Sequence, residues 1–371
     1  MSMHALVAAV EARTPPERDR AVDALRGLAI AGVVLGHWLV TAVVVDGGVF
    51  GASPLQRLPA LTPVTWLLQT LAVFFFVGGL LAGRSSIQVY RTWLRTRLSR
   101  LFRPVAALLA VWSLVAALLP TSGLDDHAVH TVVRLVLSPL WFLLVFAALT
   151  AATPLVWRLH PGWPLLVVAL VDAGRFVLGL PGWVGWVNLA AGWLVPYCLG
   201  ARVGAGAAVS GWPLLVLGGL ATVGLVHWGG YPASMVGVPG DGLSNLNPPT
   251  LAAVTFGLAQ CGAAILLLGP LRRVLRRPAL WAAVALLNLS AMTVFLWHQT
   301  AMLAVTGAGH LLAGRALPGL HTPPDGVAWL AARVAWLPVF GMALLGCWAL
   351  FRRYERAPVR EDRPVLASSR G

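Results

Sequence analysis

The chain of 371 residues is 58% hydrophobic and 11% charged, and its mean hydropathy is +0.79. A soluble domain is typically about a quarter charged, so this composition excludes an ordinary soluble protein and requires apolar surface that faces lipid. All 27 basic residues are arginines, and since they lie between long uncharged stretches, the net charge of +14 indicates membrane topology and excludes a nucleic-acid-binding protein.

Ten apolar segments are long enough to cross a bilayer, which takes about 20 residues for a core roughly 30 Å thick. They are predicted at residues 24–45, 62–83, 104–121, 137–157, 163–181, 184–201, 211–229, 250–270, 279–305 and 327–351. Lipid offers no hydrogen bonds to the backbone, so long apolar runs of this kind are helices. The sequence therefore predicts an all-α integral membrane protein, a bundle of about ten transmembrane helices.

The arginines divide unevenly between the two sides of this bundle. With the N-terminus in the cytoplasm, 22 of the 27 fall on the cytoplasmic side. The other five are Arg57, Arg134, Arg175, Arg315 and Arg333. The positive-inside rule then predicts that both termini are cytoplasmic. The expected parts are a cytoplasmic tail over 1–22, a transmembrane domain over 23–356 and a second cytoplasmic tail over 357–371.

The first segment carries an imidazole near its predicted middle. His37 is a functional candidate because lipid makes an ionisable group costly there. Arg26 comes about three helical turns earlier, on the same side of the helix and about 16 Å nearer the cytoplasm, and Asp23 falls near that face. The three side chains would line one groove from the cytoplasmic surface to mid-membrane. The structural alternative is a histidine that only hydrogen-bonds a neighbouring helix.

A basic stretch follows the second segment. In residues 90–104 apolar side chains recur at helical spacing and five arginines fill other positions, a pattern typical of an amphipathic helix at the cytoplasmic interface. Arginine forks suit phosphates, so Arg97 and Arg100 would lie ready at the mouth of the groove. Contact with anionic lipid is the alternative interpretation.

Other polar residues have structural as well as functional interpretations. Asp172 and Arg175 are three residues apart in one segment, which predicts an ion pair that supports the bundle. The loop 241–249 would either form a lip for a hydroxylated acceptor or cap the following helix. His298 would line the acceptor side or bridge helices.

No metal site is predicted. The run Asp125-Asp126-His127 with His130 has loose metal spacing, but the loop is short and lacks a closed set of ligands. The three cysteines lie in apolar stretches without paired spacing, which indicates neither a disulfide framework nor a metal knuckle.

Five short motifs resemble, in order, those of the acyltransferase 3 family. They are residues 23–29 with 35–37, residues 74–79, residues 93–104, residues 140–143 with Pro154, and residues 290–298. Members of this family are multi-pass membrane enzymes that move acyl groups from acyl-CoA to hydroxyls. One departure is Val77, where many members carry serine, so no hydroxyl is available at this position.

The resemblance implies roles for several of these residues. His37 would be the catalytic histidine, and Arg26, Arg97 and Arg100 would bind the acyl-CoA donor. Possible pocket or acceptor-side residues are Asp23, Trp141 and His298.

The function expected is an O-acyltransferase of the bacterial plasma membrane, with no bound cofactor and with acyl-CoA, acetyl-CoA favoured, as co-substrate. The acceptor would be a hydroxyl of a sugar, cell-envelope glycan or glycosylated natural product. His37 would act as the base that takes the hydroxyl proton as it attacks the thioester. The alternative is a secondary transporter of a polar or glycosylated compound, although such proteins more often show paired inverted halves. Expected partners are the two substrates and membrane lipids, with no nucleic acid.

Overall fold

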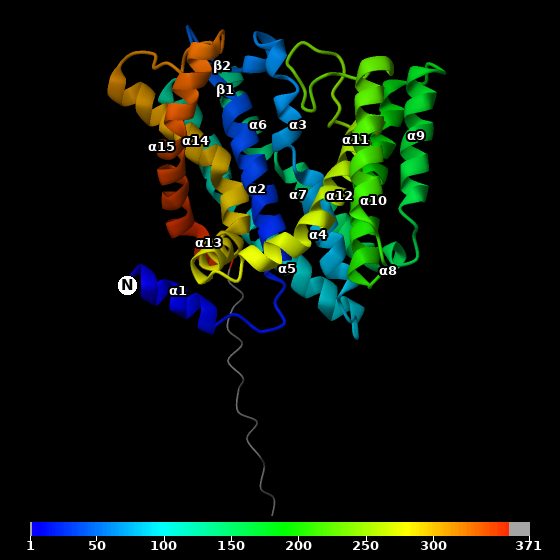
Figure 1. Cartoon of the computed structure of the whole chain (residues 1–371). Coiled ribbons are helices and arrows are strands. Elements are labelled where there is room, and N and C mark those ends of the chain that lie inside the picture. The colour runs from blue at the N-terminus through cyan, green and yellow to red at the C-terminus, as the bar shows by residue number, and fades with distance from the viewer. Residues whose placement is uncertain (1, 356–371) are drawn as a thin grey trace, which may run out of the picture.

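The computed structural model describes residues 2–355 and is an all-α membrane protein with almost no sheet, as predicted (Figure 1). Its helices are α1 (Met3–Ala12), α2 (Arg20–Val40), α3 (Val64–Leu68), α4 (Leu71–Gly83), α5 (Tyr90–Leu118), α6 (Asp126–Leu137), α7 (Leu140–Ala151), α8 (Thr153–Val156), α9 (Gly162–Phe176), α10 (Val187–Gly204), α11 (Gly211–Trp228), α12 (Leu251–Val274), α13 (Pro278–Leu289), α14 (Ala291–Ala313) and α15 (Val327–Phe351). Two strands, β1 (Ala42–Val45) and β2 (Val49–Ala52), form a hairpin. The predicted tail 357–371 lies outside the described residues.

The two ends of the bundle carry different elements. Helix α1 and the short 3-10 helix η5 (Arg352–Tyr354) lie at one end, which we call the N-terminal face (Figure 1). The β1–β2 hairpin lies at the other end, the hairpin face. The orientation predicted from the arginines makes the N-terminal face cytoplasmic.

Within the described residues, eight helices are long and apolar enough to cross a membrane. They are Arg20–Val40, Val64–Gly83, Tyr90–Thr121, Asp126–Ala151, Gly182–Gly204, Gly211–Trp228, Leu251–Val274 and Val327–Tyr354. A ninth candidate is the pair α13 and α14, which bends by 70°. The predicted span 279–305 is therefore broken, because Glu355 hydrogen-bonds the N–H groups of Met292 and Thr293 where α14 begins.

The predicted span 163–181 is shorter than expected. Helix α9 has 15 residues and is about 22 Å long, less than the roughly 30 Å of a bilayer core. It ends because Gly179 adopts a φ of 70° and Pro181 follows. In Figure 1 α9 runs along the bundle beside α10, so the predicted span exists as a shorter helix.

The first helix ends earlier than the predicted span 24–45. Helix α2 stops at Val40, and a run of β-branched residues then forms β1, with Ala42 opposite Ala52 and Val45 opposite Val49. The turn contains Gly47 at a φ of 62°, which a side chain would strain. Periodicity alone cannot separate a short apolar strand from the end of a buried helix.

The basic stretch 90–104 is not a separate interfacial helix. It forms the first half of α5, which continues through Pro104 into the third span. Pro104 and Leu101 are buried, whereas Arg91 and Arg95 are exposed. The prediction was wrong on this point because proline interrupts a helix less severely where neighbouring helices pack around it.

Helices α4 and α10 cross in direct backbone contact. The glycines that allow it are Gly79 and Gly83 on α4 and Gly200 and Gly204 on α10. A Cβ on Gly79 would collide with the carbonyl oxygen of Tyr197, and one on Gly200 would collide with that of Phe76. Small residues let transmembrane helices approach in this way. The glycine pair after Val77 therefore serves packing.

The predicted ion pair between Asp172 and Arg175 is confirmed, with Nη1 and Oδ1 3.8 Å apart. Asp172 also accepts hydrogen bonds from Asn188 (2.9 Å), the Tyr231 hydroxyl (3.0 Å) and the Leu251 backbone N–H (2.7 Å). These contacts join α9 to α10 and to the start of α12, so the carboxylate supports the bundle.

A network of charges closes the N-terminal face. Asp19 pairs with Arg272 at 2.7 Å and with Arg84 at 3.1 Å. Burial raises the pKa of Asp19, but these hydrogen bonds outweigh it and hold the pKa below the usual 3.8. A lowered carboxyl pKa adds stability above the usual value, and this stability is lost as the pH falls through the lowered one.

We therefore expect the melting temperature of the detergent-solubilised protein to fall below about pH 4, partly through Asp19. Asp19→Asn should be less stable at neutral pH and show a shallower acid loss. Asp46→Asn, at an exposed turn position, is the matched control. Parallel acid profiles for wild type and Asp19→Asn would contradict this role.

Candidate active site

His37 lies in the last turn of α2, close to the hairpin, and not in the middle of the span as predicted. The helix ends three residues later, which brings the imidazole toward the hairpin face. The carbonyl groups at a helix C-terminus carry partial negative charge and favour a cation. Here that cation is Arg333 of α15, which donates to the carbonyls of Trp38 and Thr41.

Gln299 of α14 holds the imidazole of His37. Its Nε2 lies 2.8 Å from His37 Nδ1, while its Oε1 is buried without a partner among the described residues. A carboxamide rotated by 180° would present Oε1 instead, which accepts from Nδ1–H and leaves the imidazole Nε2 free to take a proton. Gln299 can thus fix the orientation and tautomer of His37.

His298, the neighbour of Gln299, stands edge-on to His37. The ring centroids are 5.0 Å apart and the planes lie at 86°. His298 Nδ1 is 2.6 Å from the Phe295 carbonyl, which can only accept, so Nδ1 carries the proton. Its Nε2 is buried and has no partner in the described part of the chain. Both the bridging and the acceptor-side interpretations of His298 stay open.

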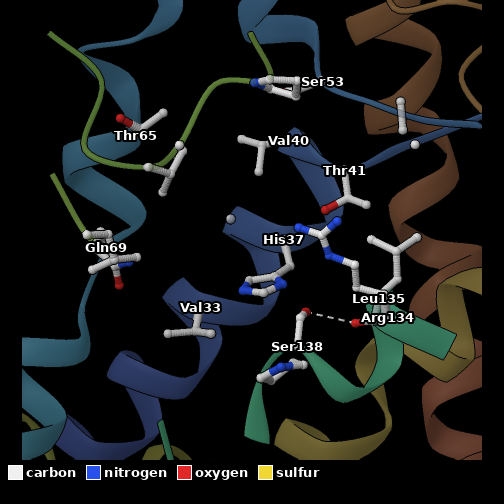
Figure 2. Close-up of a pocket in the computed structure, with 18 of the residues that line it drawn as sticks. Val33, His37, Val40, Thr41, Ser53, Thr65, Gln69, Arg134, Leu135 and Ser138 are labelled. Atoms are coloured by element: carbon white, nitrogen blue, oxygen red, sulfur yellow. Dashed lines mark hydrogen bonds between the residues drawn. The ribbon is translucent and has the colours of Figure 1, made fainter. Parts of the chain in front are cut away.

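A cavity of about 660 Å³ lies beside His37 (Figure 2). Its lining comes from α2, the hairpin, α3, the start of α4, the α6–α7 segment, the loop before α12 and α14. It includes Val33, His37, Thr41, Ser53, Thr65, Gln69, His127, His130, Arg134, Ser138, Trp141, Phe142, Val236, Leu246 and Phe295. Figure 2 shows His37 from α2 and Arg134 from α6 pointing into the same space. The size is typical of a small-molecule site.

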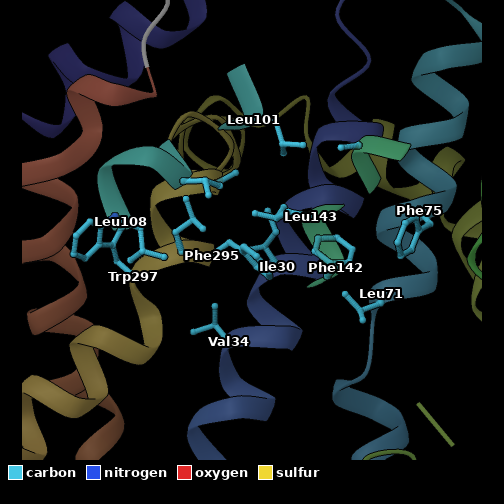
Figure 3. Close-up of a cluster of buried hydrophobic side chains, with 14 of the residues drawn as sticks. Ile30, Val34, Leu71, Phe75, Leu101, Leu108, Phe142, Leu143, Phe295 and Trp297 are labelled. Carbon is cyan, nitrogen blue, oxygen red and sulfur yellow. The ribbon is translucent and has the colours of Figure 1, made fainter. Parts of the chain in front are cut away.

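Aromatic packing fixes the helix that carries His37. Ile30 and Val34 of α2 belong to one buried cluster with Phe75, Phe142 and Phe295, which come from α4, α7 and α14 (Figure 3). The Phe142 ring lies 5.1 Å from Phe75 and 5.3 Å from Phe295. Such close aromatic contacts favour one arrangement of the four helices.

Arg333 of α15 secures the end of α2. It is 1% exposed and donates to the backbone carbonyls of Trp38 (2.7 Å), Thr41 (2.6 Å) and Gly319 (2.9 Å). Trp38 in turn donates to the His298 carbonyl at 3.0 Å. The last carbonyls of a helix lack partners, and a buried arginine supplies them here.

The predicted donor-binding residues lie on the N-terminal face, away from the cavity. Arg26 hydrogen-bonds Asn288 of α13 and lies 3.5 Å from Asp23. Arg26 and Arg97 carry like charges that repel each other. Arg97 donates to Ser85 and stacks on Trp93, and Arg100 is exposed.

The predicted site residues therefore form two groups. His37 and Trp141 line the cavity and His298 touches His37, whereas Asp23 and Arg26 lie at the other end of α2. Because α2 is one continuous helix, Arg26 and His37 are about 16 Å apart along its axis.

The loop 241–249 and helix α6 both contribute residues to the cavity lining. In the loop 241–249, Leu246 lines the cavity, and Asn245 is buried and binds Thr250, the cap of α12. The capping interpretation is confirmed, and the lip for an acceptor stays a prediction. His127 and His130 line the cavity, and within residues 2–355 no three His, Cys, Asp or Glu side chains are grouped to hold a metal.

Two features of the site were not predicted from the sequence. Gln299 directly follows His298. An amide side chain within a span indicates a hydrogen bond to a neighbouring helix, and this indication could have been used. The polar side of α6 was also missed, although His127, His130 and Arg134 are spaced three and four residues apart.

Comparison with models of known protein families assigns the chain to a family. The acyltransferase 3 family model, described as an acyltransferase domain, matches residues 19–352. The chain belongs to this family. It is a multi-pass membrane acyltransferase, and the match favours the enzyme over the transporter. Comparisons with curated proteins and with solved structures found no match.

Gln299 should matter for the acyltransferase through its contact with His37. We expect Gln299→Leu to lower kcat about 10²-fold. Without the contact to Gln299, the His37 imidazole is no longer held in the orientation that proton transfer requires. Gln299→Glu should retain most activity, since a carboxylate also accepts from Nδ1–H. Single-turnover assays of folded variants measure both, and equal rates for Gln299→Leu and wild type would exclude the orienting role.

Proposed function

We propose that this acyltransferase moves an acyl group, with acetyl favoured, from cytoplasmic acyl-CoA to a hydroxyl of a sugar, cell-envelope glycan or glycosylated natural product. Its location would be a bacterial plasma membrane. The observation that carries the proposal is His37 itself, which lines the cavity and is held at Nδ1 by Gln299. An imidazole oriented beside a small-molecule cavity suits general-base catalysis.

The chemistry follows from this geometry. The acceptor hydroxyl occupies the cavity, and the neutral imidazole takes its proton as the oxygen attacks the thioester carbonyl. The carbon–sulfur bond then breaks, and the CoA thiolate receives the proton from the imidazolium.

The donor approaches from the N-terminal face in this proposal. CoA carries phosphates that cannot enter lipid, and the arginines Arg26, Arg97 and Arg100 offer them partners. The pantetheine arm would follow α2 for about 16 Å to His37. The exposed state of Arg100 supports this route, because an exposed guanidinium is open to a soluble donor.

Comparison of a deletion strain with its parent tests the function. Mass spectrometry of envelope glycans and secreted metabolites should reveal a compound that lacks one acyl mass in the deletion strain. A plasmid copy should restore it, and a His37→Ala copy should not. Identical acylation in both strains would contradict the proposal.

A further inference from the structure

Helix α6 presents a polar side to the cavity that general-base chemistry does not require. The residues concerned are His127, His130, Thr131, Arg134 and Ser138, which all line the cavity. They are spaced three or four apart, or adjacent, and so share one side of the helix. In Figure 2 the Arg134 side chain extends from α6 toward Thr41 and His37.

This side of α6 carries the positive charge of Arg134, and Arg134, His127 and His130 are exposed, so a ligand in the cavity can reach them. None of the described residues that line the cavity is Asp or Glu. Among those same residues the Arg134 guanidinium has no hydrogen-bond or ion-pair partner. The nearest carboxylates on the helix lie at its start, where Asp125 accepts from the Ala128 N–H at 2.7 Å and caps the helix, and Asp126 is exposed.

An unpaired guanidinium directed into a cavity without carboxylates fits an anion. Arginine presents a planar fork of donors that matches carboxylate and phosphate oxygens, and such charged hydrogen bonds are among the stronger ones. Two imidazoles beside it add further N–H donors. A neutral sugar would bind this exposed fork without a charged hydrogen bond, whereas an anionic sugar gains one.

We propose that the acceptor is an anionic sugar, whose carboxylate or phosphate binds Arg134 while its hydroxyl faces His37. Arg134 is then a specificity-determining residue, with His127 and His130 at the same subsite. This inference rests on the proposed function, because it names the class of acceptor that the acyltransferase uses.

Binding measured without acyl transfer tests the subsite. Isothermal titration calorimetry of the purified full chain in nanodiscs uses methyl glucuronide, glucose 1-phosphate and the neutral methyl glucoside. We expect one anionic probe to bind at least about tenfold more tightly than the glucoside, and Arg134→Gln to weaken it about 10- to 100-fold. Arg315→Gln, an exposed arginine outside the cavity lining, should bind like wild type.

The probe that binds identifies the source of the charge, carboxylate or phosphate. The subsite is overturned if neither anionic probe binds, if the glucoside binds equally well, or if Arg134→Gln keeps wild-type affinity. The same samples receive labelled acetyl-CoA. Arg134-dependent binding without any acylation would leave the subsite standing and count against the proposed function, whereas equal acylation of neutral and anionic probes would overturn the subsite alone.

Discussion

The His37→Ala variant is expected to lose acyl transfer by about 10²- to 10⁴-fold, the contribution typical of a positioned general base. The imidazole lines the cavity, and its Nδ1 is held by Gln299. His298 touches His37, but its Nδ1 is bound to the Phe295 carbonyl. Membranes supplied with labelled acyl-CoA give the rate.

The matched control is His227→Ala, because His227 is exposed at the end of α11 and lies outside the cavity lining. Its variant should transfer acyl groups like wild type. Equal membrane insertion and equal melting temperatures establish that the loss in His37→Ala is chemical. A His37→Ala variant that works at the wild-type rate would disprove the catalytic role.

Gly79→Ala is expected to cost about 3 kcal/mol or more of folding free energy, at the upper end of what an overpacked methyl group costs. The new Cβ would meet the carbonyl oxygen of Tyr197, which belongs to the backbone of α10 and cannot rotate away. The two helices would have to separate along their whole contact. Thermal unfolding in detergent, followed by circular dichroism, measures the loss.

Gly219→Ala is the control for this prediction, since a Cβ on Gly219 meets nothing within 4 Å. It should be neutral or slightly stabilising, because alanine favours helix more than glycine does. Equal melting temperatures for Gly79→Ala and Gly219→Ala would show that α4 and α10 tolerate a wider separation.

The sequence predicted the spans well where composition alone decides them. Long apolar runs with few charges can only be helices in lipid, which located the eight long helices of the described chain. The errors have two causes. The bend before α14 depends on Glu355, which lies more than 60 residues away in sequence from Met292 and Thr293. The hairpin after Val40 and the end of α9 are local, but apolar composition alone does not separate a short strand or a shortened helix from a full span.

The site was predictable one residue at a time but not as an assembly. His37 was found because an ionisable group in a span is costly, and Trp141 through its motif. Gln299 comes to His37 only when α14 packs against α2, 262 positions away in sequence. The unpaired state of Arg134 likewise depends on which residues surround it in space.

We propose that His37 receives the donor from the N-terminal face and the acceptor from the hairpin face. Proteoliposomes with one defined orientation test it, with labelled acyl-CoA and the acceptor fraction from the deletion-strain comparison supplied on chosen sides. We predict transfer only when acyl-CoA is on the N-terminal face and the acceptor is on the hairpin face, and none with His37→Ala. Transfer with both substrates confined to the N-terminal face would contradict the claim.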